Sequence, residues 1–367
     1  MRVDRLSLQD FRNYREVSVC FDPRCNVIFG ENAEGKTNLL EALVYLSSGR
    51  SPRTRSDREL IRFDAPEARL CAAVQARERE FSVSAQLIRG RRRKLTVNGV
   101  PAKTAAEFRQ VYQTVFFCPE DLYLIRDGAA ARRRFLDDLL SQLRPRYAAA
   151  LAGYSRSYES KTRILRDRDE KPDLLEALPE FNERLIHYGA ILIHYRARLV
   201  RRLEEYAAAH HRECSGGKEE LRVRYATVSS IQDPFAPPEA LADALRAHME
   251  AHQKAELASG LCLSGPHKDD LVISINGRDA RAYSSQGQTR TAALALKLAE
   301  RQLCCDVTGE YPLLLLDDVL SELDPHRQEF VLNRIADGQV FITCCEDDRL
   351  ERLLGGKVFH VEHGTVG

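Results

Sequence analysis

The first third of the chain alternates between apolar and polar residues. This spacing predicts β-strands, because successive side chains of a strand point to opposite faces. Residues 5–8 and 17–21 alternate in this way, and Cys25–Phe29 is a short apolar run of the kind found in buried strands. A mostly apolar segment at 37–45 predicts a helix, and residues 69–100 predict antiparallel strands. The N-terminal part is therefore expected to be rich in β-structure around one buried helix.

The pattern changes between about residues 129 and 258, where Leu, Ala, Arg and Glu dominate and apolar residues recur at helical spacing. A short strand is expected inside this segment at 221–225. The alternation of strands and helices returns after residue 263, with strands expected at 271–275, 313–316, 340–343 and 358–361 and helices at 289–303 and 327–335. These patterns predict an α/β head, formed by residues 1–128 (lobe I) and 259–367, with a helical lobe II inserted at 129–258.

Size and charge narrow the class of protein. A chain of 367 residues is long for one simple core, which agrees with two lobes. The balance of 55 Lys+Arg against 54 Asp+Glu excludes a histone-like polycation. Residues 1–150 nevertheless contain 27 basic and 19 acidic residues, a net charge of +8 that weakly indicates a polyanionic ligand.

The cellular location is predicted from the lack of membrane-spanning and signal-peptide patterns in the sequence. No run of 18 apolar residues predicts a membrane span, and the N-terminus lacks the apolar stretch of a signal peptide. The ten scattered cysteines form no CxxC pair, so buried reduced thiols are expected rather than zinc or disulfides. A cytoplasmic protein without a membrane partner is expected.

A phosphate-binding loop is the strongest chemical signal. The pattern GxxxxGK[ST] is matched, between a predicted strand and a predicted helix, by Gly30, Glu31, Asn32, Ala33, Glu34, Gly35, Lys36 and Thr37. Glycines allow backbone N–H groups to surround phosphate oxygens, and the helix N-terminus adds a positive dipole. Lys36 is expected to reach the β- and γ-phosphates of ATP, Thr37 to bind Mg²⁺, and Asn38 to complete the site.

Two carboxylates follow the apolar run at 313–316, at the strand end where open α/β sheets bind ligands. Asp317 is expected to hold Mg²⁺ through a water. Asp318 is expected to orient the attacking water or accept its proton. On their own, two aspartates after four leucines could also simply begin a loop.

The order of the remaining motifs resembles that of an ABC-type ATPase head. The resemblance makes Ser285, Gln286, Gly287 and Gln288 the signature motif, which binds the γ-phosphate of ATP held by a second subunit. It makes Ser321, Glu322, Leu323 and Asp324 the D-loop along the dimer seam.

Longer segments resemble the RecF family of bacterial recombination mediators. They are LSLQDFRNY at 6–14, FCPEDL at 117–122, RRRFLD at 132–137, SGPHKDDL at 264–271 and SQGQTR at 285–290. The resemblance implies an ATP-binding protein of DNA replication and repair that binds double-stranded, gapped and single-stranded DNA. It also implies an ATP-dependent homodimer that works with RecO and RecR to load RecA at gaps, within the SOS response.

Several positions depart from the general ABC pattern. The carboxylate after the Mg²⁺ ligand is Asp318 instead of the usual Glu, and its shorter reach favours slow hydrolysis that acts as a switch. The family resemblance implies a weak, DNA-stimulated ATPase. The switch His is replaced by Thr343 or Cys344. Gln110 and Gln113 are candidates for the Q-loop residue, although either could be an ordinary surface residue.

Other charged residues have both a functional and an ordinary interpretation. Arg12 and Asn13 either contact the nucleotide or form a surface turn. Candidate contacts to DNA phosphates, which could equally be solvated charges, are Arg53, Arg55, Arg91, Arg92, Arg93 and Lys94.

Three classes of protein remain in competition. An ATP-gated DNA clamp, with two ATP molecules held between Lys36 of one subunit and Ser285 of the other, is favoured by the whole-length resemblance. The ATPase head of another ABC-type system, SMC-like or a transporter subunit, is the alternative. An SMC protein needs a longer coiled coil, and a transporter needs a membrane partner. A scaffold that binds ATP without hydrolysing it is the third class.

Overall fold

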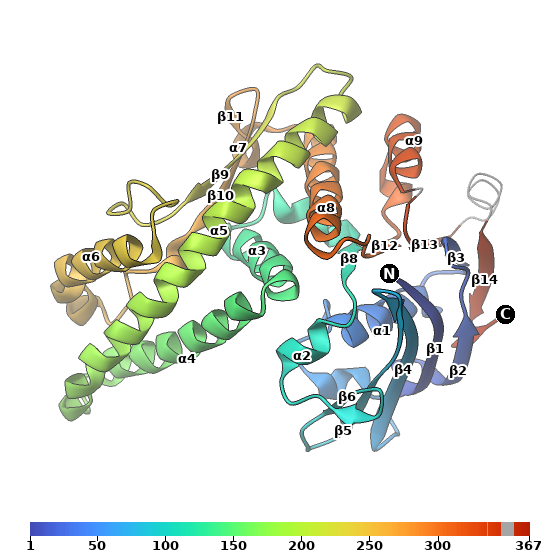
Figure 1. Cartoon of the computed structure of the whole chain (residues 1–367), viewed down its shortest axis with the longest axis horizontal. Helices are drawn as coiled ribbons and strands as arrows, with labels where there is room; N and C mark the ends of the chain where they lie inside the picture. Colours follow the sequence, from blue (N-terminus) through green and yellow to red (C-terminus); the bar gives the residue numbers. More distant parts are fainter. Residues whose placement is uncertain (336, 346–355) are drawn as a thin grey trace. The chain divides into compact units, whose positions relative to one another are not determined.

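The computed structural model describes residues 1–335, 337–345 and 356–367, which divide into two compact units (Figure 1). The first unit consists of Met1–Leu122 and Lys297–Gly367, and the second is Tyr123–Leu296. The first unit is thus assembled from both ends of the chain, with the second inserted between them.

An antiparallel sheet forms one layer of the first unit. Its strand order is β2-β1-β4-β5-β6-β7. These strands are β1 (Arg2–Phe11), β2 (Tyr14–Cys20), β4 (Glu67–Ala76), β5 (Arg79–Ile88), β6 (Lys94–Val97) and β7 (Val100–Pro101). In β4 every second side chain is buried, which is the alternation expected for a strand with one face on the core. The Asn98-Gly99 turn joins β6 to β7, with both residues at positive φ.

A second, mainly parallel sheet has the order β15-β14-β3-β13-β12-β8. Its strands are β3 (Cys25–Phe29), β8 (Thr114–Phe117), β12 (Leu313–Asp317), β13 (Val340–Cys344), β14 (Lys357–Glu362) and β15 (Thr365–Val366). All neighbouring pairs are parallel except β14 and β15. The carboxyl ends of β3, β13, β12 and β8 therefore lie along one edge of the sheet.

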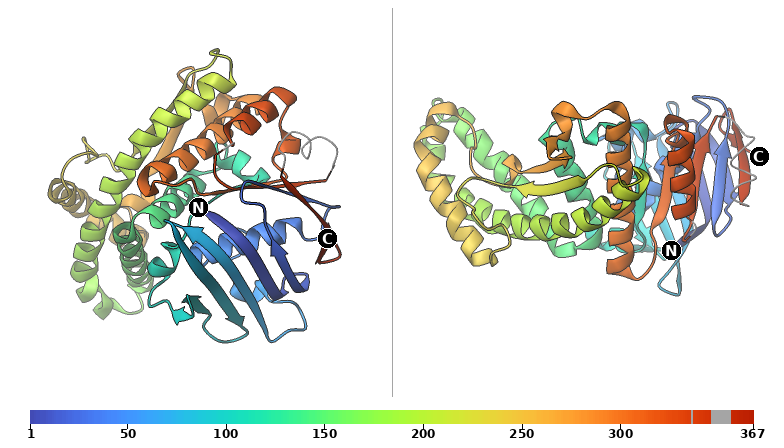
Figure 2. Two further views of the ribbon diagram at one scale, coloured as in Figure 1. Left: turned by 45° about the vertical axis from the view of Figure 1, so that its right-hand side comes forward. Right: turned by 90° about the horizontal axis from the view of Figure 1, so that it is seen from above.

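Helix α1 (Lys36–Ser48) lies between these two sheets and touches strands of both. Its buried residues join one apolar core with side chains from β1, β4, β5, β12, β13 and β14. Figure 2 shows the antiparallel sheet with the helix behind it. Burial on nearly all sides explains why the residues from Leu39 to Leu46 are apolar, with the exception of Glu41. The shorter elements of this unit are η1 (Asp57–Leu60), α2 (Ala105–Arg109), η2 (Pro119–Leu124, which runs into the second unit), η5 (Leu320–Glu322) and α9 (Pro325–Arg334).

The second unit is mainly helical. Its helices are α3 (Ala129–Leu143), α4 (Pro145–Asp167), α5 (Leu178–Cys214), α6 (Pro238–Ser259) and α7 (Ala280–Tyr283), with the turns η3 (Pro172–Ala177) and η4 (Pro266–Lys268). At Gly153 of α4 an added Cβ would lie 2.5 Å from the ring of Tyr188 on α5, so the close approach of these two helices requires glycine. Helix α8 (Gln286–Thr308) begins in this unit and ends in the first.

A small sheet extends the second unit beyond the expected boundary. Its order is β11-β10-β9, with β9 (Leu221–Ala226), β10 (Asp270–Ile275) and β11 (Arg278–Asp279). The sequence patterns placed the end of the insertion near residue 258, whereas the compact unit extends to Leu296. The physical reason is that β10 forms its ladder with β9, a strand from inside the insertion. The signature segment therefore belongs to the second unit.

The other elements agree closely with the sequence patterns. The strands expected at 5–8, 17–21, 313–316 and 358–361 lie within or largely overlap β1, β2, β12 and β14. The apolar helix expected at 37–45 lies within α1. In the part of the chain that the structure describes, no helix combines the length and apolar character needed to cross a membrane.

Candidate functional site

The phosphate-binding loop connects the end of β3 to the start of α1, at the edge where the parallel strands end. Its two glycines are required by crowding. Gly30 has φ of 157° and a Cβ there would lie 2.3 Å from the carbonyl oxygen of Val361, while Gly35 has φ of 121° and a Cβ there would lie 2.6 Å from Asn13. The loop can therefore approach its surroundings through backbone alone.

The N-terminus of α1 offers an anion site. No side chain caps it, and its first turn contains no acidic residue. Lys36 is 4% exposed, and its Nζ donates to the carbonyl oxygens of Gly30 (2.6 Å) and Glu31 (3.1 Å). A buried ammonium beside uncapped backbone N–H groups is the arrangement that binds phosphate.

The carboxylate of Asp317, at the end of β12, binds two threonines. Its Oδ1 accepts hydrogen bonds from Thr37 Oγ1 on α1 and from Thr343 Oγ1 on β13, both at 2.9 Å. Burial raises the pKa of Asp317 above its ordinary value, and the hydrogen bonds from Thr343 and Thr37 oppose this shift. Three elements that are far apart in the sequence thus meet at one oxygen.

Asp318 follows in a backbone conformation that is rare for a residue with a side chain. Its φ is 51°, and its N–H donates to Thr343 Oγ1 at 2.8 Å. Thr343 therefore holds the backbone of one aspartate and the carboxylate of the other. Such strain persists only where the surroundings fix it, and it is frequent at functional sites.

The donor set at Thr37 and Asp317 suits Mg²⁺. Among the described residues, no group of three or more His, Cys, Asp or Glu side chains could hold a metal ion unaided. Magnesium usually keeps several waters and is held by one or two carboxylates together with substrate phosphates. A hydroxyl and a carboxylate beside a phosphate-binding loop fit that ion.

Asn13 contacts the phosphate-binding loop, whereas Arg12 contacts helix α1. Asn13 Nδ2 donates to the Glu34 carbonyl at 2.6 Å, and Asn13 Oδ1 accepts from Asn38 Nδ2 at 2.8 Å. Arg12 instead makes a bidentate pair with Glu41, at 2.8 Å for both bonds. Glu41 is completely buried on α1, so the Arg12 guanidinium neutralises a charge that would be costly alone.

Glu41 was missed by the sequence patterns, although a signal was present. It is an acidic residue within the apolar run of a predicted helix, and such a residue requires a partner. Besides Arg12, it accepts a hydrogen bond from Ser51 Oγ at 2.5 Å and lies 3.7 Å from Arg53 Nη1. Arg53 also donates to Asn38 Oδ1 at 3.0 Å. The loop after α1 is thus attached to the nucleotide-facing turn of that helix.

The candidates for the switch position and those for the Q-loop position lie in different parts of the first unit. Of the two switch candidates, Thr343 contacts Asp317, as described, and Cys344 is the last residue of β13. The next residue, Cys345, was not a candidate, but its Sγ lies 3.4 Å from Lys36 Nζ and 3.1 Å from Asn32 Oδ1. Gln113 precedes β8, and its carbonyl accepts from Leu313 N at the amino ends of β8 and β12. Gln110 ends α2. Gln113 therefore lies at the opposite end of these strands from the phosphate-binding loop.

The proposed D-loop follows Asp318 directly. Ser321 Oγ donates to the Asp318 carbonyl at 2.6 Å. Asp324 is the N-cap of α9 and accepts from the N–H of Arg327 at 3.1 Å. This segment is attached to the backbone of the aspartate pair at one end and to a helix cap at the other.

The signature segment, in the second unit, forms a capping box at the start of α8. Ser285 Oγ accepts from the backbone N–H of Gln288 at 3.2 Å, and Gln288 Oε1 accepts from the N–H of Ser285 at 2.9 Å. Ser285 and Gln286 are exposed. The segment is thus a capped, solvent-facing helix N-terminus, which is a second site suited to phosphate.

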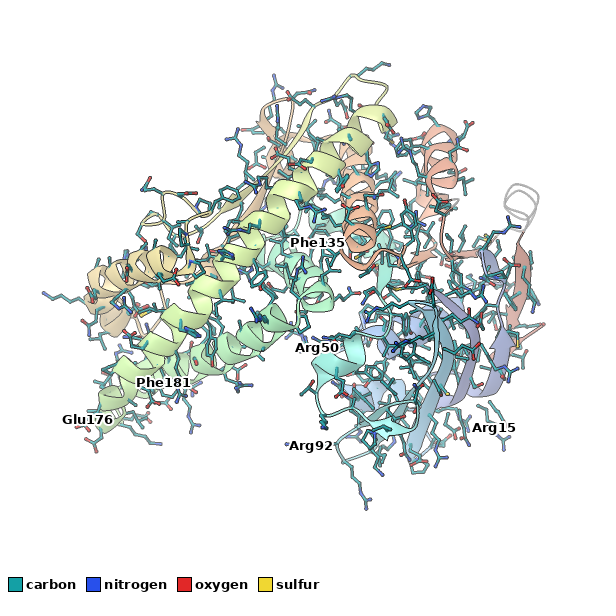
Figure 3. All side chains as sticks on the ribbon, viewed as in Figure 1. Arg15, Arg50, Arg92, Phe135, Glu176 and Phe181 are labelled. Atoms are coloured by element: carbon teal, nitrogen blue, oxygen red, sulfur yellow. The ribbon has the colours of Figure 1, made fainter. Side chains whose placement is uncertain are left out.

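The basic residues divide into anchored and exposed groups. Arg93 Nη1 donates to Asp57 at 3.0 Å and to Tyr45 Oη at 3.3 Å, so this arginine braces the hairpin tip against α1 and η1. Arg91, Arg92, Lys94 and Arg55 are exposed. Figure 3 labels Arg92 at the edge of the first unit. The expectation that Arg93 reaches DNA is thus weakened by its structural partners.

A buried ionic network fixes the SGPHKDDL segment. Arg196 of α5 is 3% exposed and donates to Asp269 Oδ2 (2.9 Å) and Asp137 Oδ1 (2.7 Å). His267 contacts Tyr154 Oη at 2.7 Å, and burial lowers its pKa to about 4, so it is neutral at physiological pH. Arg196 was also missed, and its signal was again a charge on the buried face of a predicted helix.

Comparisons with known proteins agree with this geometry. The family model described as the RecF/RecN/SMC N-terminal domain matches residues 2–365. Proteins called DNA replication and repair protein RecF are similar over full length. That of Agathobacter rectalis is 38% identical and that of Halalkalibacterium halodurans 37%, each alignment covering 100% of this chain and 99% of the relative.

Solved structures extend the comparison to the fold. One described as the recombination mediator protein RecF-ATP in the RecFOR pathway has a TM-score of 0.91 and 33% identity, covering 100% of this chain and 96% of that one. The Smc head domain of Pyrococcus furiosus has a TM-score of 0.56 and 16% identity, covering 99% and 94%, and shares the fold alone. The α/β ATPase-head fold expected from the sequence is confirmed.

Replacing Thr343 by Val tests whether this hydroxyl holds the aspartate pair. The variant removes one donor to Asp317 and leaves the partly buried N–H of Asp318 without its acceptor, which should cost about 1–3 kcal/mol of unfolding free energy. Urea unfolding followed by circular dichroism measures the change. Thr343→Ser keeps the hydroxyl and loses only the methyl group, so it should keep most of the stability. A Thr343→Val variant as stable as the wild type would contradict the role of the hydroxyl.

Proposed function

The chain belongs to the RecF family of DNA replication and repair proteins, and on this basis we propose that it is an ATP-gated clamp on DNA. ATP would bind at the loop from Gly30 to Thr37, with Mg²⁺ between its phosphates, Thr37 and Asp317. Binding of ATP would bring two copies of the chain together around DNA, and hydrolysis would release them.

One observation carries the proposal: the contact of Thr37 with Asp317 at 2.9 Å. It links the phosphate-binding helix to the carboxylate that ends β12, which are the two groups needed for Mg²⁺–ATP. Lys36, buried beside uncapped N–H groups, would exchange its two carbonyl partners for phosphate oxygens. The N-terminal dipole of α1 would add to the attraction.

Dimerisation would use the second phosphate site. The N-terminus of α8, with exposed Ser285 and Gln286, would bind the γ-phosphate held by the partner subunit. The hydroxyl of Ser285 accepts a bond from Gln288, and its hydrogen is still able to donate to phosphate. Ser321–Asp324 would line the seam. ADP lacks the γ-phosphate and would leave the two subunits apart.

Hydrolysis would be slow. Asp318 would orient the attacking water, with a side chain one methylene shorter than the Glu usual in such heads. Thr343 or its neighbour Cys344 would take the place of the switch His, and neither side chain can carry the positive charge of an imidazolium. Both differences favour a timing switch over a motor.

DNA would be bound through its phosphates. Arg91, Arg92 and Lys94 at the hairpin tip, together with Arg53 and Arg55 after α1, are exposed and basic. Interactions of this kind position DNA without reading base sequence. Arg93 would serve mainly by holding the hairpin in place. Arg53 would connect this surface to the nucleotide site, because it contacts Asn38 and Glu41 on helix α1.

The cellular role would follow from that of the relatives. Solved relatives are described as recombination mediators of the RecFOR pathway, so RecO and RecR are proposed as partners, with RecA loaded at single-strand gaps during the SOS response. Duplex, gapped and single-stranded DNA are the proposed nucleic-acid ligands. The protein would act in the cytoplasm, where the bacterial chromosome lies.

Analytical ultracentrifugation tests the clamp. The wild-type protein should sediment as a monomer with ADP–Mg²⁺ and as a dimer with ATP–Mg²⁺ at the same concentration. Ser285→Arg, which places a bulky side chain at the seam but leaves the phosphate-binding loop intact, should bind ATP and remain monomeric. A wild-type mass that is independent of the nucleotide would contradict the proposal.

The DNA surface is tested by the salt dependence of binding. Replacing Arg91, Arg92 and Lys94 by Ala should weaken duplex binding and lower the slope of log K against log salt by about 0.9 for each phosphate that is no longer neutralised. Fluorescence anisotropy of a labelled duplex across a salt series measures this slope. Arg79→Ala, an exposed arginine at the other end of β5, is the control. An unchanged slope in the triple variant would place the DNA elsewhere.

A further inference from the structure

The side chain of Gln288 makes two bonds in opposite directions. Its Oε1 accepts from the N–H of Ser285, which closes the capping box. Its Nε2 donates to Glu219 Oε1 at 2.9 Å. An amide group held at both ends cannot rotate, so the position of Ser285 depends on a residue far away in the sequence.

Glu219 comes from the connection between α5 and β9. Its other carboxylate oxygen, Oε2, lies 3.1 Å from Nε2 of His211, which is completely buried near the end of α5. The side chain of Glu219 is 21% exposed, so the carboxylate is only partly screened by water. One carboxylate therefore joins the signature segment to the end of the longest helix of the second unit.

The backbone around Glu219 is also fixed. The N–H of Glu220 donates to Asn276 Oδ1 at 2.8 Å, and the N–H of Asn276 donates to the Glu220 carbonyl at 2.9 Å. These bonds attach the connection to the turn between β10 and β11. Glu219 is thus presented to Gln288 by a rigid support.

Helix α5 runs from the far end of the second unit toward the start of α8 (Figure 1). It contains 37 residues, which corresponds to a length of roughly 55 Å. A displacement of its end would move His211 and Glu219, and with them the amide of Gln288. The contacts of Glu219 with His211 and with Gln288 therefore couple helix α5 to the signature segment.

We propose that Glu219 is a positioning residue for the ATP-dependent dimer: through Gln288 it holds Ser285 in place, and through His211 it ties this segment to α5. The proposal rests on the proposed function, since it assigns Ser285 to the γ-phosphate of the partner subunit. Without Glu219, the amide of Gln288 is free to turn and the capping box loses its fixed geometry. The phosphate-binding loop, in the first unit, is unaffected.

Measuring two dissociation constants distinguishes a positioning role of Glu219 from a general loss of structure. The first is that of the dimer in ATP–Mg²⁺, from ultracentrifugation, and the second is that of the monomer for a fluorescent ATP analogue. In Glu219→Ala the dimer constant should rise about tenfold, as expected for losing a hydrogen bond to a charged group, while the nucleotide constant stays the same.

Two further variants provide the controls. Glu219→Gln keeps an oxygen that accepts from Gln288 and should restore most of the dimer affinity. Glu220→Ala removes the neighbouring carboxylate, whose side chain pairs with Arg222 at the surface, and should behave as the wild type. If the alanine variant fails to fold, Glu219→Asp takes its place, because its shorter side chain cannot reach both partners and should also weaken the dimer.

The outcomes are distinct. Equal dimer affinity in Glu219→Ala and Glu220→Ala would overturn the positioning role while leaving the clamp intact. Parallel loss of nucleotide and dimer affinity, or no recovery in Glu219→Gln, would overturn it as well. A wild type that does not dimerise with ATP would instead contradict the proposed function itself.

Discussion

The first unit depends on one buried carboxylate. Asp317 accepts from Thr37 on α1 and from Thr343 on β13, and Thr343 in turn accepts from the backbone of Asp318. Since β13 lies between β3 and β12, this single oxygen fixes the relative positions of the phosphate-binding loop, the aspartate pair and the strand between them. Taking a carboxylate out of water is costly, and the two hydroxyls make that burial tolerable. The same hydrogen bonds therefore hold the nucleotide site and the ends of the strands in the parallel sheet.

Much of this arrangement follows from local patterns. The apolar strand before Gly30, the apolar helix after it and the leucines before Asp317 each bury a continuous surface, so periodicity and motif identify them together. The turns at Asn98-Gly99 and Asn276-Gly277 are equally local, because only a few residue types accept positive φ at both positions. What lies within one strand, helix or turn could be predicted.

The partners that residues find in distant parts of the chain could not be predicted from the sequence. That Glu41 pairs with Arg12, Arg196 with two aspartates, and Glu219 with Gln288 depends on how distant elements pack, and local patterns do not determine it. The expected end of the inserted unit, near residue 258, differs from the observed end at Leu296 for the same reason, since the pairing of β10 with β9 is a tertiary interaction. A charged residue in an apolar helix indicates that a partner exists but does not identify it. Local patterns could not choose a Q-loop residue for the same reason, because the edge of the sheet on which a residue lies is decided by strand direction.

In the proposed dimer, each nucleotide site is completed by a second copy of the chain. Mixing Lys36→Ala, which cannot bind ATP, with Ser285→Arg, which cannot complete its partner's site, tests this most directly. A mixed dimer has one complete site, formed by the loop of the Ser285→Arg subunit and the Ser285 of the other. We expect ATP turnover in the mixture and almost none in either variant alone. A mixture that is as inactive as its components would contradict it.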